Sequence, residues 1–213
     1  RMIKILLLGA ISGFPWVIIG SSLTLWLNEE GLSRSTIGWA GLIFAVYAFN
    51  YLWAPLIDRI YIPFLTKKIG HRKSWIFLMQ SIIIFCLIFW GFAEPSNSLG
   101  LVIGIGLVIA ISSSTQDITI DALRIEQIRP DEKEAMSAGA AMVVVGWWTG
   151  YKLGGALSLN LAQQFENLGY ENYWKLAFIG LGIVIVFFNI GVLFIKEKNF
   201  SEKKKNQSAL DKK

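Results

Sequence analysis

The chain has 213 residues, of which 54% are hydrophobic, and its mean hydropathy is +0.52. The apolar residues form long continuous blocks, and this arrangement excludes an ordinary soluble domain. The net charge is +5, but the basic residues gather between the apolar blocks and in the tail, so we expect no nucleic-acid partner.

Six of the blocks are long enough to cross a bilayer as helices, because a hydrocarbon core about 30 Å thick needs roughly 20 helical residues. Strands with open edges leave backbone groups unpaired in lipid, so the blocks predict helices. They cover approximately residues 3–27, 36–57, 74–93, 99–121, 136–163 and 173–195. The first block is longer than the apolar core of a signal peptide, so we expect it to be retained. The sequence therefore predicts an all-α membrane protein with six transmembrane helices in a lipid bilayer.

Pro15 interrupts the first block near its middle and should kink the helix, because proline cannot donate a backbone hydrogen bond. Such a break can border a central cavity or be a tolerated kink, and the sequence leaves both open. Glycines recur at four-residue spacing in three blocks and predict close helix packing, within the chain or between two copies. They are Gly9 and Gly13, Gly100 and Gly104, and Gly146, Gly150 and Gly154.

The segment between the second and third blocks reads APLIDRIYIPFLTKKIGHRKS, with an acid at its start and a glycine and basic cluster at its end. Its candidate functional residues are Asp58, Arg59, Gly70, Arg72 and Lys73. His71 is the only histidine and Cys86 the only cysteine of the chain. One residue of each kind makes neither a thiolate cluster nor a histidine pair, so we expect no metal and no cofactor.

The fourth block ends in STQDITIDALR, which brings Gln116, Asp117, Asp121 and Arg124 into or beside the membrane. A carboxylate at the bilayer centre costs roughly 2.5–3.5 kcal/mol, so these acids should be paired or lie near water. Asp117 and Asp121 are four residues apart and share one helix face. Asp117 either carries a proton in a water-filled cavity or makes a structural hydrogen bond. Asp121 is a second candidate for proton coupling, or it joins Arg124 and the charged loop in a gate.

The fifth block contains WWTGYKLGGAL, and its Lys152 is the only basic residue that lies away from the ends of a predicted span. Asp117 is offset in depth by roughly 15 Å on the helical rise, which is too far for a lysine side chain to reach. Lys152 therefore pairs with a missing part of the protein or an anionic ligand, or its ammonium group extends to the interface. Tyr151 and Trp148 beside it can stack on sugar rings or pack against lipid. Lys152, Tyr151, Trp148 and Gln116 are the candidate binding residues.

The basic residues divide unevenly between the two sides that six crossings define. Seventeen of the 20 fall on the side of both termini, and only Arg34 and Lys175 fall on the other. By the positive-inside rule, both termini should be cytoplasmic. We expect the protein to lie in the cytoplasmic membrane. We expect residues 1–196 to form the six-helix body. Residues 197–213 should form a charged tail or linker that is solvated or contacts anionic lipid.

Four motifs in order resemble the AmpG-type muropeptide permeases of the major facilitator superfamily, over residues 9–196. They are WAPL, the loop that runs from Asp58 to Lys73, TQDITIDALR and GYKLGG. The two halves of this loop are separated by IYIPFLTKKI, which is longer than the usual superfamily spacing. The resemblance implies a fold of twelve helices in two halves, each a pair of inverted three-helix repeats. This chain would be the N-terminal half.

The resemblance also implies proton-driven import of a muropeptide-like, small anionic solute. A second six-helix half would then come from a missing C-terminal part, a neighbouring chain or a second copy. Because the chain begins with Arg1, we expect a fragment or a truncated gene product. The alternative is a non-transporting six-helix scaffold or an inactive remnant. An intramembrane enzyme has no support, because the sequence contains neither HExxH nor GxSxG.

Overall fold

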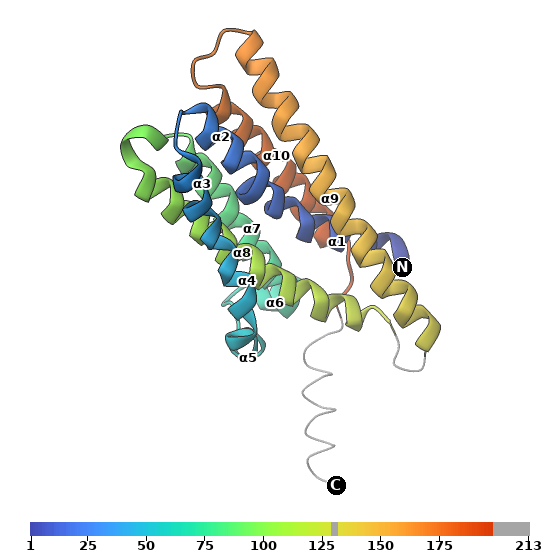
Figure 1. The fold of residues 1–213 in the computed structure, drawn as a ribbon. Coiled ribbons are helices and arrows are strands. Elements are labelled where there is room, and N and C mark those ends of the chain that lie inside the picture. The colour runs from blue at the N-terminus through green and yellow to red at the C-terminus, as the bar shows by residue number, and fades with distance from the viewer. Residues whose placement is uncertain (129–131, 198–213) are drawn as a thin grey trace.

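The computed structural model describes residues 1–128 and 132–197, and these residues form helices without strands. The long helices lie side by side as a bundle of roughly antiparallel rods (Figure 1). The first rod runs from Met2 to Glu29 as α1 (Met2–Val17), a π-helical segment (Ile18–Ser22) and α2 (Leu23–Glu29). It occupies the centre of the bundle, since most of its side chains are buried.

The second rod is broken into short pieces. It comprises α3 (Arg34–Ala40), a 3-10 turn (Gly41–Ala45), α4 (Val46–Phe49), a second 3-10 turn (Asn50–Leu52) and α5 (Ala54–Arg59). The short α6 (Leu65–Ile69) then leads into the third rod. Few side chains of the second rod are buried, so much of its apolar surface is exposed.

The remaining rods are single long helices. They are α7 (His71–Trp90), α8 (Pro95–Glu126), α9 (Lys133–Asn167) and α10 (Tyr173–Leu193). Each of the six predicted blocks therefore coincides with a helical rod, and most rods extend a few residues beyond the block. The extension is largest in α8, because helical hydrogen bonding continues through the polar residues after the apolar block.

Five rods are long and apolar enough to cross a membrane by length and composition. The remaining rod, α9, is the longest helix among the described residues, with 35 residues. Its glycines, its tryptophans and Lys152 make it less apolar than the others, which is why composition alone does not single it out.

Contacts between the rod ends define an even number of crossings. The ammonium group of Lys4, at the start of α1, donates to the backbone oxygen of Phe194, just beyond α10, at 3.1 Å. Arg1 forms an ion pair with Glu132, just before α9, at 2.7 Å. The start of the first rod and the end of the last rod therefore lie at the same end of the bundle, as the six-helix prediction requires.

The core near the opposite end is aromatic. The fully buried rings of Trp26, Trp90 and Phe178 bring together α2, α7 and α10, with centroid distances of 4.9–6.0 Å. The carboxylate of Glu29 accepts hydrogen bonds from Tyr173 Oη, at 2.8 Å, and from Trp174 Nε1. This end is thus held by buried rings and by one acid that bonds to neutral donors.

The helices α1 and α9 pack backbone to backbone through the predicted glycines. A Cβ atom at Gly9 would overlap the carbonyl oxygen of Val143, and one at Gly13 would overlap that of Trp147. A Cβ at Gly150 would overlap the backbone of Ala10 in the same way. The buried residues of α9 are all small: Gly139, Gly146, Gly150, Gly154, Ser158 and Ala162. The spacing in α1 and α9 therefore serves packing within the chain, whereas Gly100 and Gly104 face open space.

We expect Gly150→Ala to destabilise the chain, because the added methyl group would push α1 and α9 apart. Overpacking of this kind typically costs about 1–3 kcal/mol. Gly104→Ala is the matched control, since a Cβ there meets nothing within 4 Å. Thermal unfolding in detergent, followed by circular dichroism, should show a lower melting temperature for Gly150→Ala alone. Equal melting temperatures for the two variants would contradict the packing described here.

Candidate functional site

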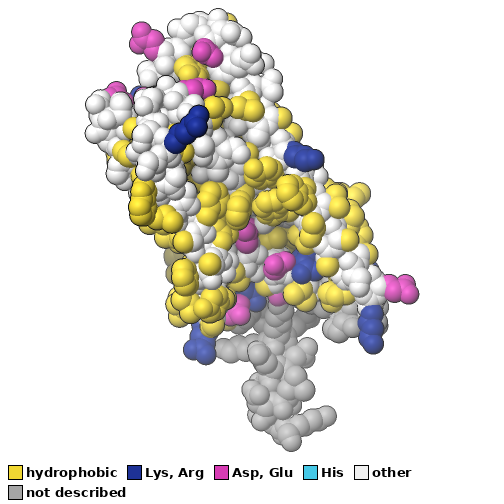
Figure 2. Space-filling view, in the orientation of Figure 1, with side chains coloured by type: hydrophobic (Ala, Val, Ile, Leu, Met, Phe, Trp, Pro, Cys, Tyr) yellow, Lys and Arg dark blue, Asp and Glu magenta, His cyan; other side chains and the backbone are white. Residues whose placement is uncertain are grey.

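A groove of about 270 Å³ opens between α1, α8 and α9. Its lining combines acids and a hydroxyl with apolar side chains: Ser12, Asp117, Ile120, Asp121, Val143, Val144 and Trp147. Figure 2 shows acidic side chains in a hollow of this face, surrounded by hydrophobic ones. Hydroxyl and carboxylate groups in an apolar setting can bind water, a proton or a polar ligand.

The two acids of the groove differ in their surroundings. The hydroxyl of Ser12 donates to Asp117 Oδ1 at 2.6 Å, and Asp117 is only partly exposed. The side chain of Asp121 is 63% exposed and pairs with Arg124 Nε at 3.2 Å on the same helix. Both carboxylates face one groove, as their spacing predicted, but only Asp117 is held against another helix.

Gln116 lies beside this groove but is fully buried against α1. Its Nε2 donates to the backbone oxygen of Ile11 at 3.0 Å. In a regular helix this oxygen would accept from the backbone N–H of residue 15, which proline lacks. The side chain of Gln116 therefore replaces the hydrogen bond that Pro15 removes, as neighbouring helices do at prolines in membranes. This contact pairs the amide nitrogen of Gln116, and binding of a solute by Gln116 stays a prediction.

Pro15 itself does not end the helix. The chain continues through it and passes into the π-helical segment Ile18–Ser22. The two serines of this segment both contact α9. Ser22 Oγ donates to Ser158 Oγ at 2.9 Å, and Ser21 Oγ lies 3.2 Å from the hydroxyl of Tyr151. The wider turn thus directs two consecutive hydroxyl groups toward the same neighbouring helix.

Aromatic rings from three rods meet between these serines and the acidic groove. Trp16 of α1 lies 4.6 Å from Phe44, 4.8 Å from Tyr47 and 5.7 Å from Trp147, as ring centroids. Trp147 in turn stacks on Tyr151 at 5.5 Å with an interplanar angle of 9°. We call Trp16, Phe44, Tyr47, Trp147, Trp148 and Tyr151 the aromatic cluster. The sequence analysis singled out only Trp148 and Tyr151 of this cluster, because nothing local indicates that Phe44 and Tyr47 approach α9.

Lys152 is exposed on α9, between the glycines that pack on α1. Within residues 1–128 and 132–197, no ion pair or hydrogen bond of its side chain is found. Tyr151 lies beside it against Ser21, and the side chain of Trp148 is also exposed, at 53%. The predicted binding residues on α9 are thus adjacent and accessible, whereas Gln116 is not.

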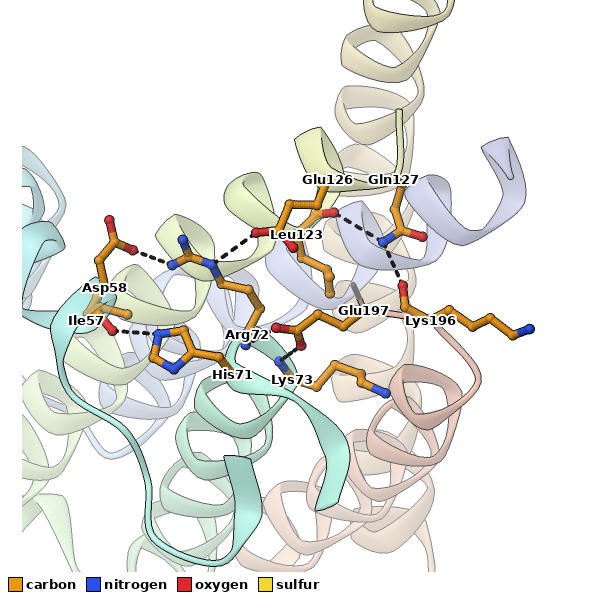
Figure 3. Close-up of polar contacts among 10 residues, drawn as sticks. All are labelled: Ile57, Asp58, His71, Arg72, Lys73, Leu123, Glu126, Gln127, Lys196 and Glu197. Carbon is orange, nitrogen blue, oxygen red and sulfur yellow. Dashed lines mark hydrogen bonds and ion pairs between the residues drawn. The ribbon is translucent and has the colours of Figure 1, made fainter. Parts of the chain in front are cut away.

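The charged loop forms a cluster of polar contacts with α8 and with the residues that follow α10 (Figure 3). The guanidinium of Arg72 pairs with Asp58 and lies 3.6 Å from the carboxylate of Glu126 on α8. His71 Nε2 lies 3.0 Å from the backbone oxygen of Ile57, which holds α5 against α7. Arg72 therefore bridges the second, third and fourth rods.

Glu197 completes this cluster from the end of the described chain. Its carboxylate accepts the backbone N–H of Arg72 at 2.9 Å and that of Lys73 at 3.1 Å. These amides belong to the first turn of α7, where a negative charge is favourable. Gly70 precedes them with a φ of 105°, and a Cβ there would overlap the Glu197 carboxylate. The backbone conformation thus favours glycine at this position, and a larger residue would also displace the carboxylate of Glu197.

The structure brings together some of the predicted gate residues but not all. Asp58, Gly70, Arg72 and Lys73 meet, the last through its backbone. Asp121 and Arg124 were expected to join them but bond to each other instead. Arg59 is exposed, and within the described ranges it has no ion pair. Ser12, Glu126 and Glu197 were not predicted from the sequence. Of these three, only Glu126 had a local signal, because acidic and basic residues alternate near the end of α8.

The sequence matches the Major Facilitator Superfamily over residues 5–212. The chain belongs to this superfamily. It is 34% identical over 210 residues to "Putative transporter AmpG 4" of Rickettsia felis, an alignment that covers 99% of this chain and 49% of that protein. It is 33% identical over 186 residues to the anhydromuropeptide permease of Escherichia coli K12, with 87% of this chain and 36% of the permease covered.

These comparisons confirm the AmpG-type resemblance and the half-superfamily, six-helix fold that the sequence motifs implied. The names of these relatives are those of a transporter and a permease, not of enzymes. The chain spans about half, or less, of the length of these relatives. The roles that the sequence analysis assigned to individual residues of this chain in binding, gating and proton coupling stay predictions.

The contact between Gln116 and the oxygen that Pro15 leaves free can be tested by a double-mutant cycle. We expect Gln116→Leu to lower the stability of the chain, because an unpaired buried carbonyl costs about 1–3 kcal/mol. Pro15→Ala should restore the internal helix bond, so Gln116→Leu should cost much less in that background. Thermal unfolding of the four proteins in detergent measures the coupling. Strictly additive effects of the two substitutions would show that the contacts are independent.

Proposed function

We propose that the chain is the N-terminal half of a proton-coupled secondary transporter that imports an anhydro-muropeptide or a related anionic solute. The observation that carries this proposal is the groove with Ser12, Asp117 and Asp121 inside an otherwise apolar bundle. Lipid-facing acids are costly, so carboxylates at such a place serve a path for protons or solute. The name of the Escherichia coli relative suggests the solute class.

The second half of the carrier is part of the proposal. It would be a C-terminal continuation of the chain, a neighbouring chain or a second copy, and it would cover the apolar and polar faces left open on the second rod and on α9. Lys152 supports this arrangement, because a cation inside the membrane needs a counter-ion or water. A peptide carboxylate or a lactyl group of the solute would supply that charge, with the aromatic cluster beside it for a sugar ring.

The cluster around Arg72 acts as the gate in this proposal. It links the ends of four rods through one guanidinium and the carboxylate of Glu197. Breaking these few contacts would let the rods separate at this end. The excess of basic residues around it supports a cytoplasmic location of this end and of both termini in the cytoplasmic membrane. Residues 198–213 of the predicted tail lie outside the described residues.

Proton coupling is tested by Asp117→Asn in the twelve-helix carrier. We expect this variant to lose uptake driven by a proton gradient in proteoliposomes, because the amide cannot carry the proton. Exchange of labelled for unlabelled anhydro-muropeptide should persist, since exchange needs no net proton transfer. Glu94→Gln, an exposed acid at the opposite end of the bundle, is the matched control and should retain both activities. Gradient-driven uptake by Asp117→Asn equal to the parent would refute the assignment, and no uptake by the parent would favour the scaffold alternative.

The charge of Lys152 is tested by two substitutions of similar length. We expect Lys152→Met to abolish uptake and Lys152→Arg to retain part of it, because arginine keeps the charge with a different geometry. The effect should shrink for an analogue whose carboxylates are amidated. Uptake is compared at equal expression. If Lys152→Met transports as well as the parent, the lysine merely extends to the interface.

A further inference from the structure

A second hollow lies at the end of the bundle opposite to the Arg72 cluster. It has a volume of about 330 Å³ and lies between the first rod and the start of the second. Its lining residues are Ser21, Thr24, Leu25, Asn28, Arg34 and Ile37. The lining therefore contains two hydroxyls, an amide and a guanidinium, but no carboxylate. We call it the outer hollow.

The polar residues of the first rod in this hollow lie on one helical face. Ser21, Thr24 and Asn28 are spaced three and four residues apart, and all three side chains are exposed. Ser21 and Thr24 belong to a segment long and apolar enough to cross a membrane. Exposed polar side chains on such a segment are unfavourable in lipid, so this face borders water or a polar ligand.

Arg34 supplies the charge of the outer hollow. In the part of the chain that the structure describes, its guanidinium forms no ion pair. The nearest acids in sequence are directed elsewhere. Glu29 bonds to Tyr173 and Trp174 of α10, and Glu30 lines a separate hollow with those residues. A guanidinium without a carboxylate, next to hydroxyl and amide groups, has the composition of a site for carboxylate or phosphate oxygens.

One residue of the outer hollow contacts a predicted binding residue on α9, Tyr151. Ser21 Oγ, on its inner side, lies 3.2 Å from the hydroxyl of Tyr151, and Lys152 follows Tyr151. From Ser21 to Asn28 the helical rise covers about 10 Å. A polar face of this length fits an extended solute with more than one polar group, with the cation Arg34 among the lining residues.

We propose that the outer hollow is a binding subsite for a carboxylate of the solute, with Arg34 as its cation and Asn28, Thr24 and Ser21 as hydrogen-bonding partners. The solute would meet Arg34 first and Lys152 second. This subsite rests on the proposed transport function for its solute, but all of its residues lie within this chain. Its binding can therefore be measured without the second half.

The test uses the whole chain in phosphatidylcholine nanodiscs and two probes, N-acetylmuramic acid and its carboxyl methyl ester. We expect the parent to bind the acid and to bind the ester more weakly. Arg34→Gln should weaken binding of the acid by about tenfold or more, as for a lost charge-assisted hydrogen bond. Arg34→Lys should retain part of it. Lys175→Gln, which removes the other basic residue of this end outside the outer hollow, is the matched control and should bind as the parent.

Circular dichroism confirms that each variant keeps its helical content before binding is measured. Equal binding of acid and ester, no binding by the parent, or unchanged binding by Arg34→Gln would each overturn the subsite. An anionic lipid headgroup is the other source of such an anion. If Arg34→Gln loses retention of added phosphatidylglycerol but keeps acid binding, the outer hollow is a lipid site and the proposal fails. The transport proposal is judged separately, by uptake through the twelve-helix carrier.

Discussion

The hydrogen bond from Gln116 to Ile11 is the contact on which the centre of the bundle depends. Pro15 leaves a backbone oxygen without its helical donor in the most buried rod, and lipid offers no replacement. One side chain of α8 supplies the donor, and this fixes the crossing of α1 and α8. Each helix continues with a residue of the groove: Ser12 follows Ile11, and Asp117 follows Gln116. These two side chains form a hydrogen bond there. Asp117 is therefore positioned by the neighbouring hydrogen bond, in which Gln116 replaces the backbone donor that Pro15 lacks.

The other constraint is the glycine contact between α1 and α9. Because a Cβ at Gly9 or Gly150 would overlap a facing backbone, the two helices approach to a distance that larger residues would prevent. The narrow buried face of α9 leaves the rest of its circumference open. Its exposed side chains, Lys152 and Trp148 among them, are thus accessible on the surface of the bundle. Packing and accessibility on α9 follow from the same small residues.

Much of this arrangement follows from the sequence, and the rest depends on contacts between distant residues. Continuous apolar blocks predicted every rod, and the glycine spacing in α1 and α9 predicted their close packing. The bond between Gln116 and Ile11 joins residues 105 positions apart, so no local pattern predicts it. Glu197 is assigned to the charged tail by composition, yet its carboxylate caps the first turn of α7. The broken second rod was also missed, because its apolar composition hides the two 3-10 turns.

The two ends of the bundle are held by different kinds of contact. At the end where α1 begins and α10 ends, the contacts include ion pairs of Arg1 with Glu132 and of Arg72 with Asp58 and Glu126. At the other end, Glu29 accepts from neutral aromatic donors beside buried rings. Dissolved salt screens charge pairs near water but leaves hydrophobic contacts and neutral hydrogen bonds largely intact. We therefore expect rising ionic strength to weaken the contacts at the first end more than those at the other, so the ionic composition on a single side of the membrane would act on one end of the bundle.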